Sequence, residues 1–118
     1  MATEWPSAGD LMTTRPSTLP PDAALSQALG LMRSRGFHEI PILRLRKLIG
    51  MITFESIARR QNLRLATKVE HVMIIPPIVN AKTPYPELAE QLLGAGIRAA
   101  PVVGRRGELI GVVSRTDM

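Results

Sequence analysis

The fold of this chain is decided by residues 40–53, IPILRLRKLIGMIT, in which two apolar runs, Ile40–Leu43 and Leu48–Ile52, flank a polar turn. A related segment, APVVGRRGELIGVVS, occupies residues 100–114. Short apolar runs joined by a polar turn are typical of two paired strands. Both copies keep a Pro in the second position of the first run and a Gly in the third position of the second run. The sequence therefore predicts an internal repeat.

The repeat extends outward from these strands. Leu11-Met12 matches Val72-Met73, Pro16 matches Pro77, and Gly36 matches Gly96, always 60 or 61 residues apart. A helix is predicted before each strand pair. The first is capped by Asp22 and the second by Thr83, with Pro84 at the first helical position; both helices end at the two matched glycines. A further helix is expected from Thr53 to about Gln61.

These elements predict an α+β fold of two βαββα-like halves, with one repeat at 10–61, a linker at 62–70 and a second repeat at 71–118. The last helix of the second repeat is expected to be truncated. Because neither half can bury its strands alone, we expect the two sheets to pack about a pseudo-twofold axis, with clefts where the halves meet. The residues predicted to be mostly buried are Ile40, Ile42, Ile49, Ile52, Val102, Val103, Ile110 and Val112.

Composition excludes several classes of protein. The 118 residues contain no cysteine, which excludes disulfides and thiolate metal sites and is compatible with the cytoplasm, the predicted location. No apolar run of 18 residues is present, so no membrane span is predicted. The two histidines, His38 and His71, have no acidic partner at metal-ligand spacing, and no catalytic motif is found. We therefore predict a protein without a metal, cofactor or catalytic residues.

The doubled order of helix, apolar-Pro-apolar-apolar strand, polar turn, Gly-containing strand and helix resembles the CBS domain, which usually occurs in pairs. The resemblance implies a regulatory module that binds AMP, ADP, ATP or S-adenosylmethionine between its repeats. It also implies that the segment Gly-apolar-apolar-Ser/Thr-x-x-Asp holds the ligand ribose through its Asp. The second repeat matches in full, from Gly111 to Asp117, whereas the first repeat carries Ser56 in place of the Asp.

Other positions follow from the same resemblance. A basic or imidazole side chain before the apolar-Pro strand is expected near the ligand phosphate, and the start of the opposite repeat is expected to contact the base. The predicted ligand-binding residues are Asp117, Ser114, Arg98, Thr14, Arg15, Pro16, Thr53 and Thr116, with a second, weaker site at His38 and Ser56.

Simpler interpretations remain for these residues. Ser114 and Asp117 also form a capping-box pattern, and Arg98 has the character of a solvated surface residue. A ligand-free dimerisation module is a second hypothesis for the chain. A basic module associated with nucleic acid is a third, less favoured one, because the net charge is +5 but only four aromatic residues are present. We also expect a homodimer, formed through helices near 54–60 and after Ser114, and an attached or separate effector domain.

Overall fold

The computed structural model describes residues 4–118, which form two compact units. We call Ser17–Ile75 the first-repeat unit, and residues 4–16 together with 76–118 the second-repeat unit. Each unit combines one two-stranded antiparallel sheet with short helices, which confirms the predicted α+β class and the two repeats.

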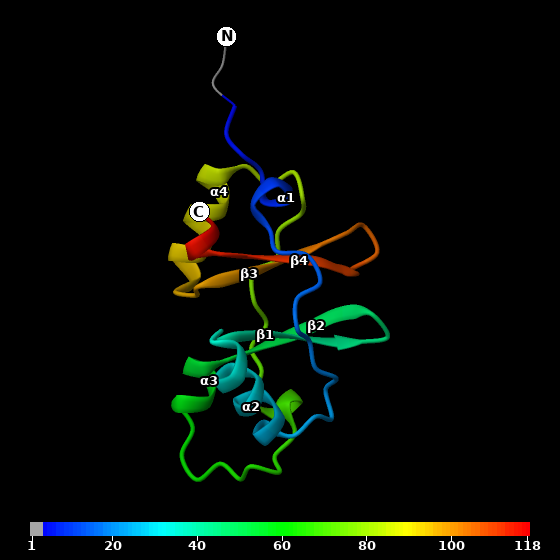
Figure 1. Ribbon diagram of the computed structural model, residues 1–118, viewed down its shortest axis with the longest axis vertical. Coiled ribbons are helices and arrows are strands. Elements are labelled where there is room, and N and C mark those ends of the chain that lie inside the picture. The colour runs from blue at the N-terminus through cyan, green and yellow to red at the C-terminus, as the bar shows by residue number, and fades with distance from the viewer. Residues whose placement is uncertain (1–3) are drawn as a thin grey trace. The chain divides into compact units, whose positions relative to one another are not determined.

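The first-repeat unit contains α2 (Leu25–Arg35), β1 (Glu39–Arg44), β2 (Lys47–Thr53), α3 (Phe54–Ala58) and the 3-10 turn η1 (Val69–His71). The second-repeat unit contains α1 (Ala8–Leu11), α4 (Tyr85–Ala95), β3 (Ala99–Val103), β4 (Leu109–Ser114) and the 3-10 turn η2 (Arg115–Asp117). In Figure 1, α2 and α3 lie on the same side of the β1–β2 hairpin, and α1 and α4 lie on the same side of the β3–β4 hairpin.

The strand pairs are the predicted ones, and their irregularities are duplicated. The register of β1 against β2 shifts between Ile42 and Leu43. The register of β3 against β4 shifts between Val102 and Val103, the equivalent positions of the second repeat. A register irregularity at the same place in both hairpins indicates that the repeat extends to the details of the backbone.

The segment that precedes each repeat pairs with the strands of the other repeat. Thr13 exchanges two backbone hydrogen bonds with Val112, at 2.8 and 3.0 Å. Met51 exchanges two with Ile74, at 2.9 and 2.8 Å. Residues 8–16 therefore belong to the second-repeat unit, although in sequence they stand next to the first repeat.

Two matched glycines make this pairing possible. A Cβ atom on Gly50 would lie 2.5 Å from the Met73 sulfur, and one on Gly111 would lie 2.6 Å from the Met12 sulfur. A side chain at either position would therefore displace the methionine that crosses the strand, and at Gly111 it would also meet the Thr13 carbonyl oxygen at 2.9 Å. Each matched Gly therefore lies on a strand, and each matched Met lies on the segment that crosses that strand and contacts it.

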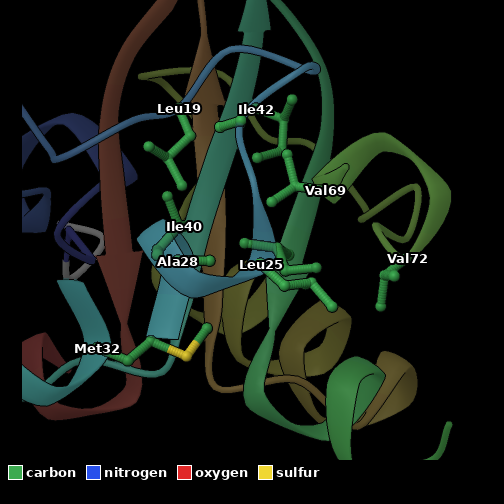
Figure 2. Packing of buried hydrophobic residues seen from close by; sticks show 10 residues of the cluster. Leu19, Leu25, Ala28, Met32, Ile40, Ile42, Val69 and Val72 are labelled. Carbon is green, nitrogen blue, oxygen red and sulfur yellow. The ribbon is translucent and has the colours of Figure 1, made fainter. Parts of the chain in front are cut away.

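Each unit has its own apolar core. Figure 2 shows the core of the first-repeat unit, where side chains of α2, the β1–β2 hairpin and the η1 region meet. Its buried members are Leu19, Ala23, Leu25, Ala28, Met32, Ile40, Ile42, Ile52, Val69 and Val72. In the second-repeat unit, a cluster of buried side chains is formed by Ala8, Val79, Leu88, Val102 and Val113.

The eight strand residues predicted to be mostly buried are all buried or of intermediate exposure. Ile40, Ile42, Ile52, Val102 and Val103 are buried. Ile49, Ile110 and Val112 are of intermediate exposure. Ile110 and Val112 share one face of β4, because side chains two residues apart point the same way, and Val113 on the opposite face is buried.

The predicted helix caps were wrong at Asp22 and Thr83. Helix α2 starts after Ala24, and the amides of Leu25 and Ser26 donate to the carbonyls of Thr67 and Leu65 at 2.8 and 3.0 Å. Carbonyl groups of a neighbouring segment therefore accept the hydrogen bonds of the first-turn amides, in place of the side chain of a capping residue.

Helix α4 is arranged similarly, since it starts after Pro84 and the Tyr85 amide donates to the Pro6 carbonyl at 2.9 Å. Thr83 instead accepts a hydrogen bond from the amide of Asn80. Gly36 and Gly96 do end their helices in the left-handed conformation, as predicted, with φ of 74° and 64°. Helix α3 stops at Ala58, before the predicted Gln61.

Candidate functional site

The candidate site is the junction between β4 and η2, where Ser114 and Asp117 form a capping box. One carboxylate oxygen of Asp117, Oδ2, accepts hydrogen bonds from the Ser114 amide at 2.9 Å and the Ser114 hydroxyl at 3.0 Å. Across residues 4–118, no donor forms a hydrogen bond with the other oxygen, Oδ1. The half-buried carboxylate is therefore held in one orientation and keeps one oxygen available to a ligand.

Two other predicted residues lie at this junction. The Thr116 hydroxyl is 2.7 Å from the Ser114 hydroxyl. Arg98 is placed by its backbone, because its carbonyl accepts a hydrogen bond from the Arg115 amide at 2.8 Å, and its side chain is exposed. The structure thus brings Arg98, Ser114, Thr116 and Asp117 together where β3 begins and β4 ends.

The predicted segment Thr14–Pro16 lies further away. Thr13 pairs with Val112 in an antiparallel bridge, so the residues after Thr13 run back along β4, away from Ser114. Thr14 is therefore about three residues from Ser114 along the strand direction, or roughly 10 Å. Arg15 has a positive φ of 53°, and Thr14 and Arg15 are exposed. No hydrogen bond joins this segment to the Asp117 junction within the described part of the chain.

The equivalent junction of the first-repeat unit has the same backbone and different chemistry. The Ser56 amide donates to the Thr53 hydroxyl at 2.9 Å, and the Phe54 amide donates to the His38 carbonyl at 2.9 Å, as Arg115 does to Arg98. The Ser56 hydroxyl accepts from the Thr53 amide at 3.1 Å and donates to the Thr53 carbonyl at 2.8 Å. Its hydrogen is therefore already used, and no carboxylate is present.

The sequence prediction missed one residue of the site. The Arg115 side chain donates from Nε to the Ile97 carbonyl at 3.1 Å and so joins η2 to the residues before β3. Phe54 stands at the equivalent position of the first repeat, where its ring lies 5.6 Å from the ring of His38. The signal was available in the alignment of the two repeats, because position 115 directly follows the Ser of the capping box. In the part of the chain that is described, no three His, Cys, Asp or Glu side chains are grouped so as to hold a metal ion.

Comparison with known families identifies the repeats. The CBS domain family model matches residues 8–62 and residues 69–118. The chain therefore belongs to the CBS domain family and carries two copies of the domain. The matched ranges follow the sequence, whereas the compact units exchange the segments that precede each repeat.

Curated relatives agree with this assignment. CBS domain-containing protein YhcV of Bacillus subtilis is 31% identical over 116 residues, which cover 95% of this chain and 82% of that protein. An uncharacterized protein of Methanocaldococcus jannaschii is 30% identical over 92% of this chain. An inosine-5'-monophosphate dehydrogenase of Korarchaeum cryptofilum is 31% identical over 86% of this chain. The chain spans only 26% and 21% of the latter two proteins.

Solved structures share the fold. The CBS domain pair of protein MJ0100, in complex with 5'-methylthioadenosine and S-adenosyl-L-methionine, superposes with a TM-score of 0.86 at 22% identity, over 96% of this chain and 92% of that one. The protein CBSX2, in complex with AMP, superposes with a TM-score of 0.82 at 24% identity, over 95% of this chain and 92% of that one. Within residues 4–118, none of the helices is long and apolar enough to cross a membrane.

Proposed function

We propose that this CBS pair is a regulatory module that binds one adenosine-type ligand at the β4–η2 junction, and that it has no catalytic role. The observation that carries the proposal is the orientation of Asp117. Ser114 occupies one carboxylate oxygen of Asp117 with two donors, and Oδ1 is left as an acceptor. A ribose offers two adjacent hydroxyl donors, and a fixed, ionised acceptor is suited to them.

The other residues would each contact a different part of the ligand. Arg98, whose backbone is bonded beside the junction, would meet a phosphate or carboxylate of the ligand. Ser114 and Thr116 supply hydroxyl groups next to the carboxylate. The segment Thr14–Pro16, further along β4, would face the base of an extended ligand. The complexes of similarly folded proteins with AMP and with S-adenosyl-L-methionine support this ligand class.

The first-repeat junction would bind a ligand more weakly, through His38 and Ser56. Thr53, which was predicted with the residues of the strong site, lies at this junction beside Ser56. Its backbone is equivalent, but Ser56 brings no charge and already donates its hydrogen to Thr53. We therefore expect one strong site per chain.

Ligand binding would act on a partner. A ligand shifts a conformational equilibrium only by its differential affinity for two states, so a domain that senses those states is required. Much longer relatives, such as the dehydrogenase of Korarchaeum cryptofilum, are consistent with an effector domain attached to such a module. We propose that the module works in the cytoplasm as a homodimer.

The direct test is calorimetric titration of the chain and of Asp117→Ala with AMP, ATP and S-adenosylmethionine. A hydrogen bond to a charged group contributes about 1.5–3 kcal/mol, so Asp117→Ala is expected to weaken binding roughly 10- to 100-fold. Asp117→Asn is expected to weaken it too, because the charge is lost and the shape is kept. Arg98→Ala is the matched variant, expected to weaken AMP and ATP but not adenosine.

Two results would contradict the proposal. If no adenosine compound binds the unmodified chain below about 1 mM, the ligand-free dimerisation module becomes the better explanation. Equal affinity of Asp117→Ala and the unmodified chain would place the ligand elsewhere.

A further inference from the structure

The tip of the β1–β2 hairpin has an unusual backbone. Arg44 pairs with Lys47 as the last pair of the ladder, so the connecting loop consists of Leu45 and Arg46 alone. Both loop residues have positive φ, 51° and 69°, which two-residue hairpin loops normally reserve for Asn and Gly. Each non-glycine residue in this conformation costs about 1–2 kcal/mol. Strain retained at an exposed loop points to a use for the side chains it presents.

The side chains at this tip form a small surface that we call the basic knob, residues 44–47. Leu45 is 90% exposed and lies between cationic neighbours. Arg44 makes a 3.5 Å ion pair with Glu70. Within residues 4–118, Arg46 and Lys47 form no ion pair. An exposed aliphatic side chain surrounded by cations is suited to an apolar surface bordered by carboxylates.

The basic knob also belongs to the charged part of the molecule. The first-repeat unit contains nine Lys and Arg residues against four Asp and Glu residues, whereas the second-repeat unit contains six of each. The whole net charge of +5 is therefore carried by the unit that bears the knob.

A complementary surface lies on α4 of the second-repeat unit. Glu87, Glu90, Leu93 and Gly94 are exposed and share one helix face, because they are spaced three, four and seven residues apart. Leu93 is 70% exposed, and a Cβ atom placed on Gly94 would meet no atom within 4 Å. This acidic helix face therefore combines two carboxylates with an apolar side chain and an open position beside it.

Neither surface is duplicated in the other repeat. The equivalent face of α2 carries Gln27, Gly30, Arg33 and Ser34, without a carboxylate. The β3–β4 loop is longer, contains Gly104, Gly107 and Glu108, and has no apolar residue at its tip. Because neither surface occurs in both repeats, neither is a feature that the two CBS domains share.

We propose that the basic knob of one copy of this chain docks on the acidic helix face of a second copy. Leu45 seats over Gly94 beside Leu93, while Arg46 and Lys47 meet Glu87 and Glu90. The contact is independent of the adenosine site. Because it involves only about four residues on each side, it is smaller than a stable dimer interface, and the association is weak and sensitive to salt.

The test is sedimentation velocity of the full chain at concentrations up to about 1 mM in low and high salt. The mean mass is expected to rise with concentration in low salt and to fall when salt is added. Arg46→Glu with Lys47→Glu, and separately Glu87→Lys with Glu90→Lys, are each expected to weaken association more than about tenfold. A mixture of these two double variants is expected to associate again, because the reversed charges are then complementary.

The matched control is Arg105→Glu with Arg106→Glu, which reverses the basic residues of the β3–β4 loop and is expected to leave association unchanged. Leu45→Ala is expected to weaken association about tenfold, since an apolar side chain loses its burial. A mean mass that does not rise with concentration overturns the proposal. So does a concentration-dependent rise in mass that withstands both charge reversals and salt. Calorimetry with AMP on the same samples tests the ligand site on its own, so a failure of the docking proposal is distinguished from a failure of the proposed function.

Discussion

The strand-to-helix junctions of the two repeats have nearly the same backbone and different side chains. In both, the residue after the strand donates its amide to a carbonyl before the other strand, from Phe54 to His38 and from Arg115 to Arg98. Both also close a capping box, but Ser56 completes the first with a hydroxyl and Asp117 completes the second with a carboxylate. The comparison teaches that the backbone of the junction is duplicated, whereas its charge is set by a single position, which is Ser56 in the first repeat and Asp117 in the second.

The largest expected effect concerns the two matched glycines. A Cβ atom on Gly111 would lie 2.9 Å from the Thr13 carbonyl oxygen, and one on Gly50 would lie 3.1 Å from the Ile74 oxygen. The methionine that each Cβ also meets can rotate, but a paired backbone carbonyl cannot. Gly111→Ala is therefore expected to lower the free energy of unfolding by about 3 kcal/mol, and Gly50→Ala by about 1 kcal/mol, in urea denaturation. If both substitutions lower the free energy of unfolding equally, the closer backbone contact at Gly111 has no effect on stability.

The second prediction transfers the carboxylate between the repeats. Ser56→Asp places a carboxylate at the first-repeat junction, where the Thr53 amide can donate to it as the Ser114 amide donates to Asp117. Calorimetry with AMP is expected to change from one site per chain to two, with at least a roughly tenfold gain at the new site. Ser56→Ala serves as the control and is expected to leave the stoichiometry at one. If the stoichiometry of Ser56→Asp stays at one, residues other than position 56 also account for the difference in binding between the two junctions.

The third prediction compares the two hairpin loops. Replacing Leu45 by Asn and Arg46 by Gly supplies residues that tolerate positive φ, so the free energy of unfolding is expected to rise by about 1–2 kcal/mol. In the β3–β4 loop, Gly107 already occupies the positive-φ position, at 82°. Arg106→Gly is the control, since Arg106 has no positive φ to relieve, and it is expected to bring no such gain. Thermal unfolding that does not shift upward in the double variant would argue against stored strain at the knob.

The smallest effect concerns the segments that precede the repeats. In the second-repeat unit, the Ser7 amide and then the Ser7 hydroxyl donate to Asp10 and lower the pKa of its carboxyl. The equivalent residue of the first-repeat unit is His71, at the end of η1, where no capping box forms. A lowered pKa means that the box stabilises the fold above the ordinary pKa of Asp and that this contribution is lost as pH falls through the lowered value.

An NMR pH titration is therefore expected to place the Asp10 midpoint below the usual value of about 3.9. Ser7→Ala removes the hydroxyl donor and keeps the amide donor, so it is expected to return the midpoint only part of the way toward that value. A midpoint that Ser7→Ala does not move would assign the lowered pKa to the Ser7 amide alone.

Much of the fold was predictable, because it depends on local patterns. The strands around Pro41 and Pro101 follow from short apolar runs with turn residues between them, and Gly36 and Gly96 end helices because a left-handed residue is needed there. The capping box of Ser114 and Asp117 was also predictable, since it joins residues only three apart. Where the prediction failed, at the start of α2, amides found partners on residues 65–67 rather than on the side chain of Asp22.

The candidate site was predicted through the repeat and the family resemblance, and its internal geometry required coordinates. No local pattern states that Asp117 uses one oxygen for Ser114 and leaves the other available, or that Arg115 reaches the carbonyl of Ile97. The direction of Thr14–Pro16 along β4 likewise depends on the pairing of Thr13 with Val112, which joins residues 99 positions apart.

The sequence by itself determined that the chain contains two copies of one α+β unit, where their strands and turns lie, and that only the second copy carries the carboxylate. These features depend on residue type and short spacing, which act within a few residues. The tertiary structure alone decided that residues 8–16 pair with the strands of the second repeat and that residues 69–75 pair with those of the first. Such pairing depends on backbone hydrogen bonds between distant segments, and backbone groups are the same in every residue, so the sequence leaves their partners open.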